Sequence, residues 1–492
     1  MHAPLLLTFV LPLLSLPFIY ISKKRPYIAA ASIISSCAIN LVILLMMVPT
    51  VLSEGKYVET YRWIPTLSTP LTLFVDGISL SLAVITLILV ISAAAFSVGY
   101  IEKEKGSIRE YYMLLAFLTV GLVGVFITSN LMVFYFCWEF MLIPTYFIIG
   151  GWGYRESYRA AFKFFIFTHA GAVSVLLGIG AVYMLTGSLD IFSARTLLMS
   201  ASPSILQWIF VAFTLGFAVK MAVVPLHMWL PDAHAEAPAP ISALLSGVII
   251  EAGAYAILRV SFGTVFPSIS SSISGTQFLY IISLLGVISA FYGAMTALAE
   301  NDIKRIVAYS SISHMGYVLF GLSLYPLAEG VVGTVLHLVN HAASKGLLFL
   351  CAGAVMKQTG LRDIREMGGL ASKMPVTAVS TAISSFSVAG IPAFACFISE
   401  FLIFMGGFQA SNTDSFFYLP TSLMVVATVF SLAYVLRLFW RVFLEEPKQK
   451  TVTKLPTLMG ASMLFLSLIN VALGIWPGPI ISLIGSAEIG RG

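Results

Sequence analysis

Charged residues are scarce in this chain. Of its 492 residues only 10% are charged, whereas 59% are hydrophobic, and the formal net charge is +5. Soluble globular proteins contain about 25% charged residues, so the composition excludes a soluble protein. The small net charge gives no indication of nucleic-acid binding. The sequence instead indicates a polytopic membrane protein.

Cysteines and cofactor motifs are also few. The four cysteines lie inside apolar runs without any paired spacing, which indicates buried thiols and neither a disulfide nor a metal site: Cys37, Cys137, Cys351 and Cys396. The sequence contains no Walker A segment, no G-x-G-x-x-G and no nucleophile elbow, and no set of residues suited to an iron–sulfur cluster or haem. We therefore expect no metal and no cofactor in this chain. Energy for transport would come from an ion gradient or a partner protein.

Apolar runs long enough to cross a hydrocarbon core of about 30 Å recur along the whole sequence. We predict an all-α membrane protein of about fourteen spans, with residues 1–492 forming a single membrane domain. The predicted spans cover residues 4–20, 27–51, 75–100, 111–128, 130–149, 163–185, 206–228, 241–262, 277–298, 305–324, 329–355, 376–404, 419–443 and 457–483.

Basic residues are distributed unevenly between the two sides of the predicted membrane domain. Twenty lie in the loops that follow odd-numbered spans, and four lie on the other side: Lys56, Arg62, Arg195 and Arg491. Because cytoplasmic loops carry an excess of lysine and arginine, we expect both termini to face outward. The expected location is the plasma membrane of a prokaryote.

Five acidic or lysine residues deep inside predicted spans alternate in charge sign along the chain: Glu139, Lys220, Glu251, Lys345 and Glu400. Ionisable groups at membrane depth cost several kcal/mol unless they are paired or solvated, so they are functional candidates. His337 and His341 share one helix face with Lys345, because the three recur at spacings of four. His314 follows a cluster of serines that includes Ser310. A row of such groups could exchange protons without any one of them being permanently charged in lipid.

Structural roles for the same residues remain open at this point. Glu139 and Lys220 could form a static ion pair between two helices. Glu251 could be a carboxyl group tolerated on a cavity wall, and Lys345 could extend toward a membrane face. Interior histidines such as His337 and His341 are often only hydrogen-bonded. Arg259, near the end of a span, is expected to be an anchor.

Each half of the chain contains an interrupted helix. Pro225 follows Lys220 closely in the first half, and in the second half Gly390 and Pro392 precede Glu400. Proline and glycine break helices, and broken helices at corresponding places are typical of inverted-repeat transporters. We therefore predict breaks in the seventh and twelfth spans.

The polar segment after Pro225 contains four residues with metal-ligand side chains: His227, Asp232, His234 and Glu236. The residue types alone permit a metal site. The prolines between them favour a helix cap or turn. We include His227 and His234, with His314, His337 and His341, in a supporting polar path.

Three segments resemble the antiporter-like membrane subunits of respiratory complex I. They are FYFCWEFMLIPTYFIIGGWG (134–153), GFAVKMAVVPLHMWLPDAHAEAPAPISALLSG (216–247) and NDIKRIVAYSSISHMGYV (301–318). The similarity is greatest to the subunit M or chain 4 type, whose relatives occur in Mrp antiporters and membrane-bound hydrogenases. The resemblance implies fourteen helices with two inverted five-helix repeats, at 111–262 and 277–443. It also implies a proton half-channel in each repeat.

The resemblance also implies roles for particular residues. Glu139 matches the family's glutamate that tunes a neighbouring lysine, Lys220 matches that lysine, and Glu400 matches the glutamate of the subunit M type. The chain departs from the pattern in IIEAGAY, where Glu251 stands at the position of a central lysine. Lys345 is the candidate for the replacement cation.

The function implied is that of a proton-translocating membrane subunit of a complex I-type NADH (or other donor)-quinone oxidoreductase. Other membrane and peripheral subunits would be its partners, and they would carry the iron–sulfur clusters and a flavin or nickel–iron centre. Alternatives are a subunit of an Mrp-type Na⁺/H⁺ antiporter, or of a membrane-bound hydrogenase or sulfur reductase. A further alternative is a structural subunit that has lost transport and only links its neighbours.

Overall fold

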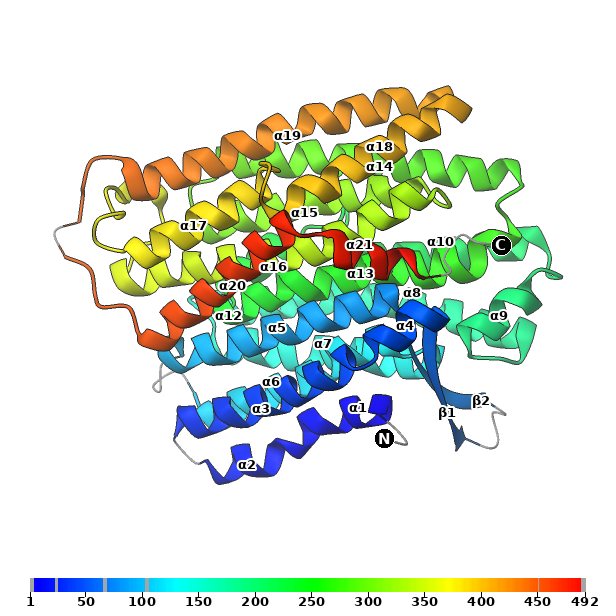
Figure 1. Cartoon of the computed structure of the whole chain (residues 1–492), viewed down its shortest axis with the longest axis horizontal. Helices are drawn as coiled ribbons and strands as arrows, with labels where there is room; N and C mark the ends of the chain where they lie inside the picture. Colours follow the sequence, from blue (N-terminus) through cyan, green and yellow to red (C-terminus); the bar gives the residue numbers. More distant parts are fainter. Residues whose placement is uncertain (1–3, 23–24, 65–68, 102–105, 450, 488–492) are drawn as a thin grey trace.

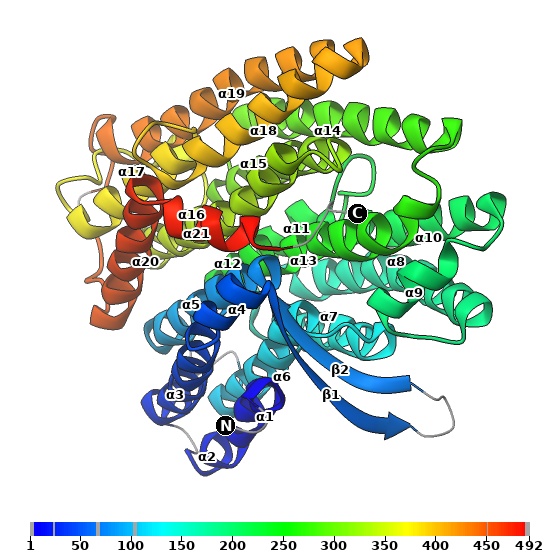
Figure 2. The same ribbon diagram turned by 45° about the vertical axis from the view of Figure 1, so that its right-hand side comes forward.

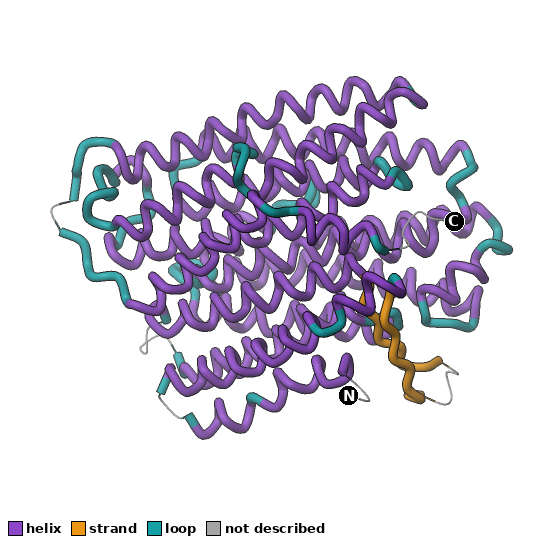
Figure 3. The backbone as a smooth tube through the Cα atoms, viewed as in Figure 1, coloured by secondary structure: helices purple, strands orange, loops and turns teal. Residues whose placement is uncertain are grey.

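The computed structural model describes residues 4–22, 25–64, 69–101, 106–449 and 451–487. Helices dominate it, and the long ones run roughly side by side (Figure 1; Figure 3). The α-helices are α1 (Pro4–Leu14), α2 (Leu16–Ile21), α3 (Pro26–Leu45), α4 (Val48–Glu54), α5 (Gly77–Tyr100), α6 (Ile108–Ile127), α7 (Leu131–Trp152), α8 (Ser157–Thr186), α9 (Ile191–Leu198), α10 (Pro203–Met221), α11 (Leu230–Glu236), α12 (Ala239–Leu244), α13 (Ile250–Ala256), α14 (Ile273–Ala299), α15 (Ile303–Ser323), α16 (Ala328–Thr359), α17 (Pro375–Val388), α18 (Ala395–Thr413), α19 (Tyr418–Phe439), α20 (Thr457–Ile475) and α21 (Gly478–Gly485).

Several shorter helical stretches join or extend these helices. The π-helical ones are η2 (Leu245–Ile249), η3 (Ile257–Val265) and η7 (Trp440–Leu444). The 3₁₀ turns are η4 (Phe266–Ser268), η5 (Ile364–Glu366) and η6 (Ser415–Phe417). Residues 239–268 therefore form one continuous helical span.

The described residues contain thirteen helical spans long and apolar enough to cross a membrane. The predicted span at 376–404 is the exception, because it is divided into α17 and α18. Counting that pair as one crossing gives the fourteen spans expected from the sequence. The prediction of an all-helical polytopic membrane protein with breaks in its seventh and twelfth spans is confirmed. The repeat boundaries at 111–262 and 277–443 stay a prediction.

α16 lies at the centre of the structure. It packs against α5, α12, α15, α17, α18 and α20, and nearly all of its residues are buried. The outer helices instead expose many large apolar side chains, among them Phe147, Leu177 and Val429. An apolar exterior matches lipid tails, while close packing in the interior holds such helices together. The polar groups of α16 are thus kept away from lipid.

Two β-strands were missed by the sequence prediction, which placed residues 52–74 in a loop. β1 (Lys56–Ile64) and β2 (Thr69–Asp76) form an antiparallel hairpin, which projects from the junction of α4 and α5 (Figure 2). The strands are rich in β-branched and aromatic residues, which favour β-structure. The Glu59 carboxylate accepts hydrogen bonds from the backbone N–H groups of Leu5 (2.8 Å) and Leu6 (3.1 Å), and so fixes the first turn of α1.

A buried ion pair connects the hairpin to the end of the eighth span. The Asp76 carboxylate caps α5 through the N–H groups of Ile78 and Ser79, and it also accepts a 2.6 Å bond from Arg259 Nη2. Both side chains are at least nine-tenths buried. The expectation that Arg259 acts as an anchor agrees with this contact.

Replacing Arg259 with alanine is expected to destabilise the protein strongly. Removing one partner of a buried pair leaves the other charge uncompensated, at a cost of about 3–5 kcal/mol. The measurement is the unfolding midpoint of the purified chain in detergent. Arg365→Ala is the matched control, because Arg365 is largely exposed beside Asp363; it should leave the midpoint nearly unchanged. Equal shifts for the two variants would contradict the prediction.

Some of the basic residues used for the orientation lie outside the described residues: Lys23, Lys24, Lys103, Lys105, Lys450 and Arg491. The described basic residues on the predicted inner side include Lys163, Arg305 and Arg362. These three form ion pairs around α11, with Asp232, Glu236, Glu300 and Asp302.

Candidate functional site

Lys220 lies one residue from the end of α10, at the first helix break. The helix ends at Met221 and not near 228 as predicted, because Ala222 adopts a left-handed conformation with φ of +58°. Lys220 is fully buried. Its Nζ donates to the Trp138 carbonyl oxygen at 3.1 Å and lies 3.9 Å from the centre of that indole ring. A cation held over an indole face is stabilised by the ring quadrupole.

Glu139 lies on α7 next to Trp138, but its carboxylate forms no ion pair with Lys220, although both residues are described. Glu139 Oε2 instead lies 3.8 Å from His169 Nδ1 on α8. The two side chains are 18% and 46% exposed, respectively. His169 was missed in the sequence, because a single histidine in an apolar helix carries no motif. Glu139 and Lys220, which the sequence suggested could form an ion pair, are therefore connected through the backbone of Trp138, the residue before Glu139.

A left-handed alanine also occurs in the second break. Ala393, with φ of +72°, lies between α17 and α18, and it and Ala222 are the non-glycine residues with positive φ in the described part of the chain. This conformation costs an L-residue about 1–2 kcal/mol. Backbone strain of this kind tends to occur at functional sites. The break in each half of the chain therefore contains an alanine in the left-handed conformation.

The carboxylates of the polar segment hold α11 to its neighbours. Asp232 accepts from Lys163 Nζ at 2.7 Å and from Arg305 Nη1 at 2.9 Å, and Glu236 accepts from Arg362 at 3.3 Å. These contacts support the structural interpretation over a metal site at Asp232, His234 and Glu236. A cavity of about 440 Å³ opens beside them, lined by Glu156, Arg159, Ala160, Lys163, Asp232, Ala235, Glu236 and Arg305.

The Asp232 contacts make stability depend on pH. Burial alone would raise the pKa of Asp232, but hydrogen bonds from Lys163 and Arg305 outweigh it and hold the pKa below its ordinary value. A carboxyl group with a lowered folded pKa stabilises the fold above its ordinary pKa, and this contribution is lost as pH falls through the lowered value. The difference in unfolding midpoint between wild type and Asp232→Asn should therefore be largest near neutral pH and should disappear in acid.

Unfolding measured from pH 7 down to pH 3 tests this expectation, with the exposed Glu446→Gln as the control variant. A difference that stays constant over the whole range would contradict the role of the Asp232 charge.

The two histidines of the polar segment have different surroundings. His234 is fully buried and stacks on Phe349 with ring centres 4.5 Å apart, and neither of its nitrogens has a hydrogen-bond partner among the described residues. His227 packs edge-on against Tyr292. No hydrogen bond in the described part of the chain joins either histidine to the five central titratable groups, so their place in the proton path stays a prediction.

Glu251 forms the first contact of a central polar cluster. It lies in α13 between the two π-helical stretches η2 and η3. Such wide turns are frequent at functional sites, because they change the direction of the neighbouring side chains. Glu251 Oε1 lies 2.9 Å from His341 Nδ1 on α16, and both groups are buried. His341 Nε2 has no hydrogen-bond partner within the described ranges.

Lys345 lies one helical turn beyond His341 on α16. It is fully buried, and its Nζ donates to the Ser310 hydroxyl on α15. The Tyr434 hydroxyl on α19 lies 3.3 Å from His314 Nε2. These contacts show that Lys345 does not extend toward a membrane face. They also identify Tyr434, which the sequence prediction did not include.

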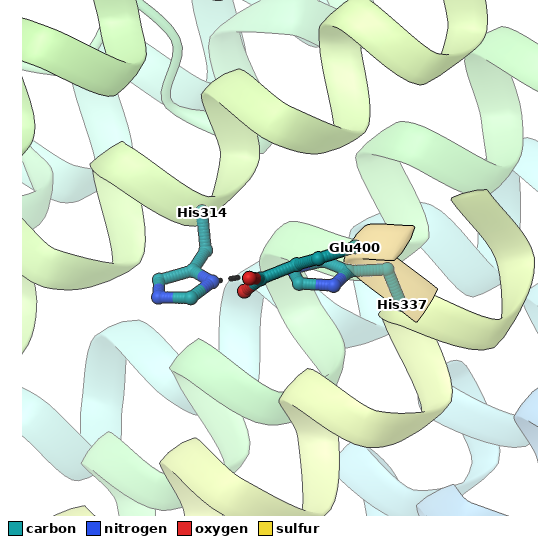
Figure 4. A group of neighbouring side chains, drawn as sticks. All are labelled: His314, His337 and Glu400. Atoms are coloured by element: carbon teal, nitrogen blue, oxygen red, sulfur yellow. Dashed lines mark hydrogen bonds between the residues drawn. The ribbon is translucent and has the colours of Figure 1, made fainter. Parts of the chain in front are cut away.

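Glu400 is the last of the five central titratable groups along the chain and lies on α18, just after the second break. Figure 4 shows His314 on α15, His337 on α16 and Glu400 on α18 directed toward one another. His314 Nδ1 lies 3.1 Å from His337 Nε2, and His337 Nδ1 lies 3.0 Å from the Ser399 hydroxyl. The Glu400 carboxylate rests against Gly390 so closely that a Cβ there would collide with it, and Gly390 also has a positive φ of +66°. A larger residue there would be strained by the positive φ and would displace the Glu400 carboxylate.

The titratable groups inside the predicted spans therefore fall into two separate sets. Glu251, His341, Lys345, His314, His337 and Glu400 lie together in one buried cluster with Ser310, Ser399 and Tyr434, joined in part by hydrogen bonds. The His341 and His314 ring centres are 5.5 Å apart, and a Glu400 oxygen lies within 4.8 Å of His314 and His337 nitrogens. Among the described residues, no side-chain hydrogen bond joins Lys220 to this cluster. Groups that can both donate and accept hydrogen bonds at such distances can relay a proton. The cluster contains the groups that a proton relay needs, and a role for Lys220 as its proton donor stays a prediction.

Comparison with known proteins identifies the family. Residues 128–431 match the family described as "NADH:quinone oxidoreductase/Mrp antiporter, TM". NADH-quinone oxidoreductase subunit M of Pseudomonas aeruginosa is 35% identical over 433 residues, covering 86% of this chain and 82% of that relative. This chain belongs to the NADH:quinone oxidoreductase/Mrp antiporter family.

One further relative and two solved structures are also similar to this chain. F(420)H(2) dehydrogenase subunit M of Methanosarcina mazei is 32% identical over 435 residues, covering 87% of this chain and 85% of that relative. A chain in respiratory complex I from Thermus thermophilus has a TM-score of 0.86 at 25% identity, covering 99% of this chain and 100% of the other. A chain in the Mrp complex from Dietzia sp. DQ12-45-1b has a TM-score of 0.87 at 22% identity, with 99% and 97% covered. The last similarity shows the fold alone.

Family membership confirms the resemblance seen in the sequence, including its subunit M type. The one departure from the expected pattern, Glu251, acquires a physical explanation in the structure. It is paired with His341, and the buried Lys345 lies one turn away on the same helix as that histidine. That Lys345 takes the place of the family's central lysine stays a prediction.

Proposed function

We propose that this chain is a proton-translocating, antiporter-like membrane subunit of a complex I-type oxidoreductase. The observation that carries the proposal is the cluster from Glu251 to Glu400, buried at the centre of a membrane protein. Its relatives named as NADH-quinone oxidoreductase subunit M support the type of complex. Burying titratable side chains at membrane depth costs free energy, so such residues are expected to have a role in transport.

The proposed proton path begins at Lys220. Electron transfer in partner subunits would change the environment of the Glu139 and His169 pair. Because Glu139 follows Trp138 directly, a shift of this turn of α7 would alter the carbonyl that holds Lys220. Lys220 could then give up its proton toward Glu251. Pro225 and the strained Ala222 free the backbone at the helix end, which allows this local movement.

The second part of the path uses the cluster itself. The proton would pass from Glu251 to His341 and on to Lys345, which lies one turn away on α16. From there Ser310, Tyr434, His314 and His337 connect to Glu400. Glu400 would release the proton toward the outside through the second break, where α17 ends and backbone groups are exposed.

The proposed setting is a prokaryotic plasma membrane, with both termini outward. Other membrane subunits would flank this chain. Peripheral partners would carry the iron–sulfur clusters and a flavin or nickel–iron centre. The chain itself would contribute proton transfer and no redox step. The comparisons favour the subunit M role over an Mrp-type antiporter or a sulfur reductase complex: a subunit M relative is 35% identical, whereas the sulfane sulfur reductase chain is 27% identical and the Mrp chain 22%.

Mass spectrometry of the complex purified from native membranes in mild detergent tests the proposed setting. Co-purification with iron–sulfur subunits is expected, and the identity of the most peripheral subunit would reveal the electron donor. Recovery of small membrane subunits alone would contradict the oxidoreductase assignment and favour an antiporter.

A further inference from the structure

The second break holds a set of groups that the proton path does not fully explain. His314, His337 and Glu400 come from three helices that are distant in sequence, and all three side chains are buried. One nitrogen of each histidine and one oxygen of the carboxylate lie within 4.8 Å of one another. In the part of the chain that the structure describes, no other group of three potential metal ligands converges in this way. Because no spacing motif relates the three residues, their convergence is visible only in the folded chain.

The separation of these atoms suits a tetrahedral metal ion. Ligand bonds of about 2.0–2.1 Å place neighbouring ligand atoms of a tetrahedral site about 3.3 Å apart. His314 Nδ1 and His337 Nε2 are already 3.1 Å apart. The Glu400 oxygen must move about 1–1.5 Å closer to complete the third position, which rotation of a glutamate side chain can provide. Two histidines and one glutamate form a known ligand set for zinc with one position open.

The outer nitrogens of both rings are also occupied in the manner of metal ligands. His314 Nε2 faces the Tyr434 hydroxyl at 3.3 Å, and His337 Nδ1 faces the Ser399 hydroxyl at 3.0 Å. Metal-binding histidines almost always donate their other N–H to an oxygen, which fixes the ring and its tautomer. The Ser399 hydroxyl donates to the Cys396 carbonyl at 2.8 Å and so leaves its lone pairs for His337. These contacts of the outer nitrogens are a second observation that favours a metal site, separate from the spacing of the three ligand atoms.

We propose that His314, His337 and Glu400 form a binding site for Zn²⁺ or a similar transition-metal ion, and that the bound ion closes the proton path. The ion takes the place of the hydrogen now shared between the two rings. Because Ser399 donates to the Cys396 carbonyl, His337 already carries its hydrogen on Nδ1, so the hydrogen between the rings belongs to His314. His314 moves this hydrogen to Nε2, facing Tyr434, and both inner lone pairs then bind the metal. A proton on Glu400, if present, leaves to solvent. The blocking part of this proposal rests on the proposed function.

The ligand chemistry defines which ions the site accepts. Imidazole nitrogens with one carboxylate suit Zn²⁺, Cu²⁺ and Ni²⁺, whereas Mg²⁺ and Ca²⁺ require oxygen ligands. Lys345 is a buried cation beside the three ligands: it donates to Ser310 and lies 6.0 Å from the Tyr434 ring, whose hydroxyl contacts His314. Its positive charge opposes metal binding. Removing that charge should therefore tighten the site, an effect that damage to the fold could not produce.

The first experiment measures Zn²⁺ binding to the purified full chain by competition with a chromophoric chelator. One ion per chain is expected, with affinity at least about 100-fold weaker in His337→Gln and tighter in Lys345→Met. His234→Gln is the matched control, because His234 is also buried but lies outside the cluster; its affinity should equal that of the wild type. X-ray absorption at the zinc edge should show two imidazole ligands. Unchanged affinity in His337→Gln, or a spectrum without imidazole, would overturn the site.

The second experiment adds Zn²⁺ to the intact complex in proteoliposomes and follows proton pumping per electron. A loss of pumping that a chelator reverses, at the Zn²⁺ concentration that fills the site, would support the proposal. Binding to His337 without any loss of pumping would leave the site in place and overturn the proton path through it. Pumping that responds to Lys220 variants while no zinc binds would overturn the metal site alone.

Discussion

Lys220→Ala is expected to abolish proton translocation by this subunit while leaving its assembly intact. Lys220 is the buried cation at the first break, and its ammonium contacts the Trp138 carbonyl and ring. Alanine removes the proton carrier and leaves a small apolar side chain that can remain buried. The measurement is the number of protons moved per electron in proteoliposomes, together with native gel analysis of the complex. Lys454→Ala, at an exposed position, is the control and should behave as wild type.

Lys220→Arg separates a proton carrier from a structural cation. Arginine keeps the charge and can still donate to the Trp138 carbonyl, but it does not release its proton in a protein. If Lys220 transfers protons, the arginine variant should assemble and should fail to pump, like the alanine variant. Normal pumping by Lys220→Arg would show that the position needs only a positive charge and would reject the transfer role.

Glu251→Gln is expected to slow translocation by about 10²-fold or more, the usual contribution of a positioned acid–base group. Glutamine keeps the shape and a hydrogen bond to His341 but cannot take up a proton. The relevant measurement is the initial rate of proton uptake into proteoliposomes at saturating electron donor. Glu446→Gln, at an exposed position, provides the matched control.

The pairing of Glu251 with His341 can be tested by a double-mutant cycle. If the two residues act as one relay step, then Glu251→Gln combined with His341→Asn should be no slower than the more severe single variant. Effects that multiply would show that the two residues act independently, despite their 2.9 Å separation.

Much of the fold followed from the sequence, because long apolar runs report membrane spans directly. The breaks were also predictable, since Pro225 and Pro392 lack a backbone donor and Gly390 is a weak helix former. Their exact form was not: α10 ends at the left-handed Ala222, and alanine gives no sign of such a conformation. The hairpin at 56–76 was hidden because short alternating strands between two strongly apolar runs leave a weak pattern.

The site was predictable as a set of residues but not as a set of contacts. Lys220, Glu251 and Glu400 could be identified as titratable residues inside apolar runs. The sequence could not show that Glu139 lies beside His169, because these residues are on different helices and no spacing relates them. The convergence of His314 and His337 with Glu400 depends in the same way on how three helices pack.

The position of Glu139 and His169 has a consequence for the biogenesis of this protein. They lie on α7 and α8, helices that also expose large apolar side chains such as Phe140, Phe147 and Ile166. A polar pair among such residues lies at a surface that faces lipid when the chain is alone, and one Glu139 oxygen has no hydrogen-bond partner in the described part of the chain. Exposure of this polar pair to lipid therefore raises the free energy of the newly inserted chain. A neighbour that covers this surface removes the cost, which favours assembly over persistence as an orphan subunit.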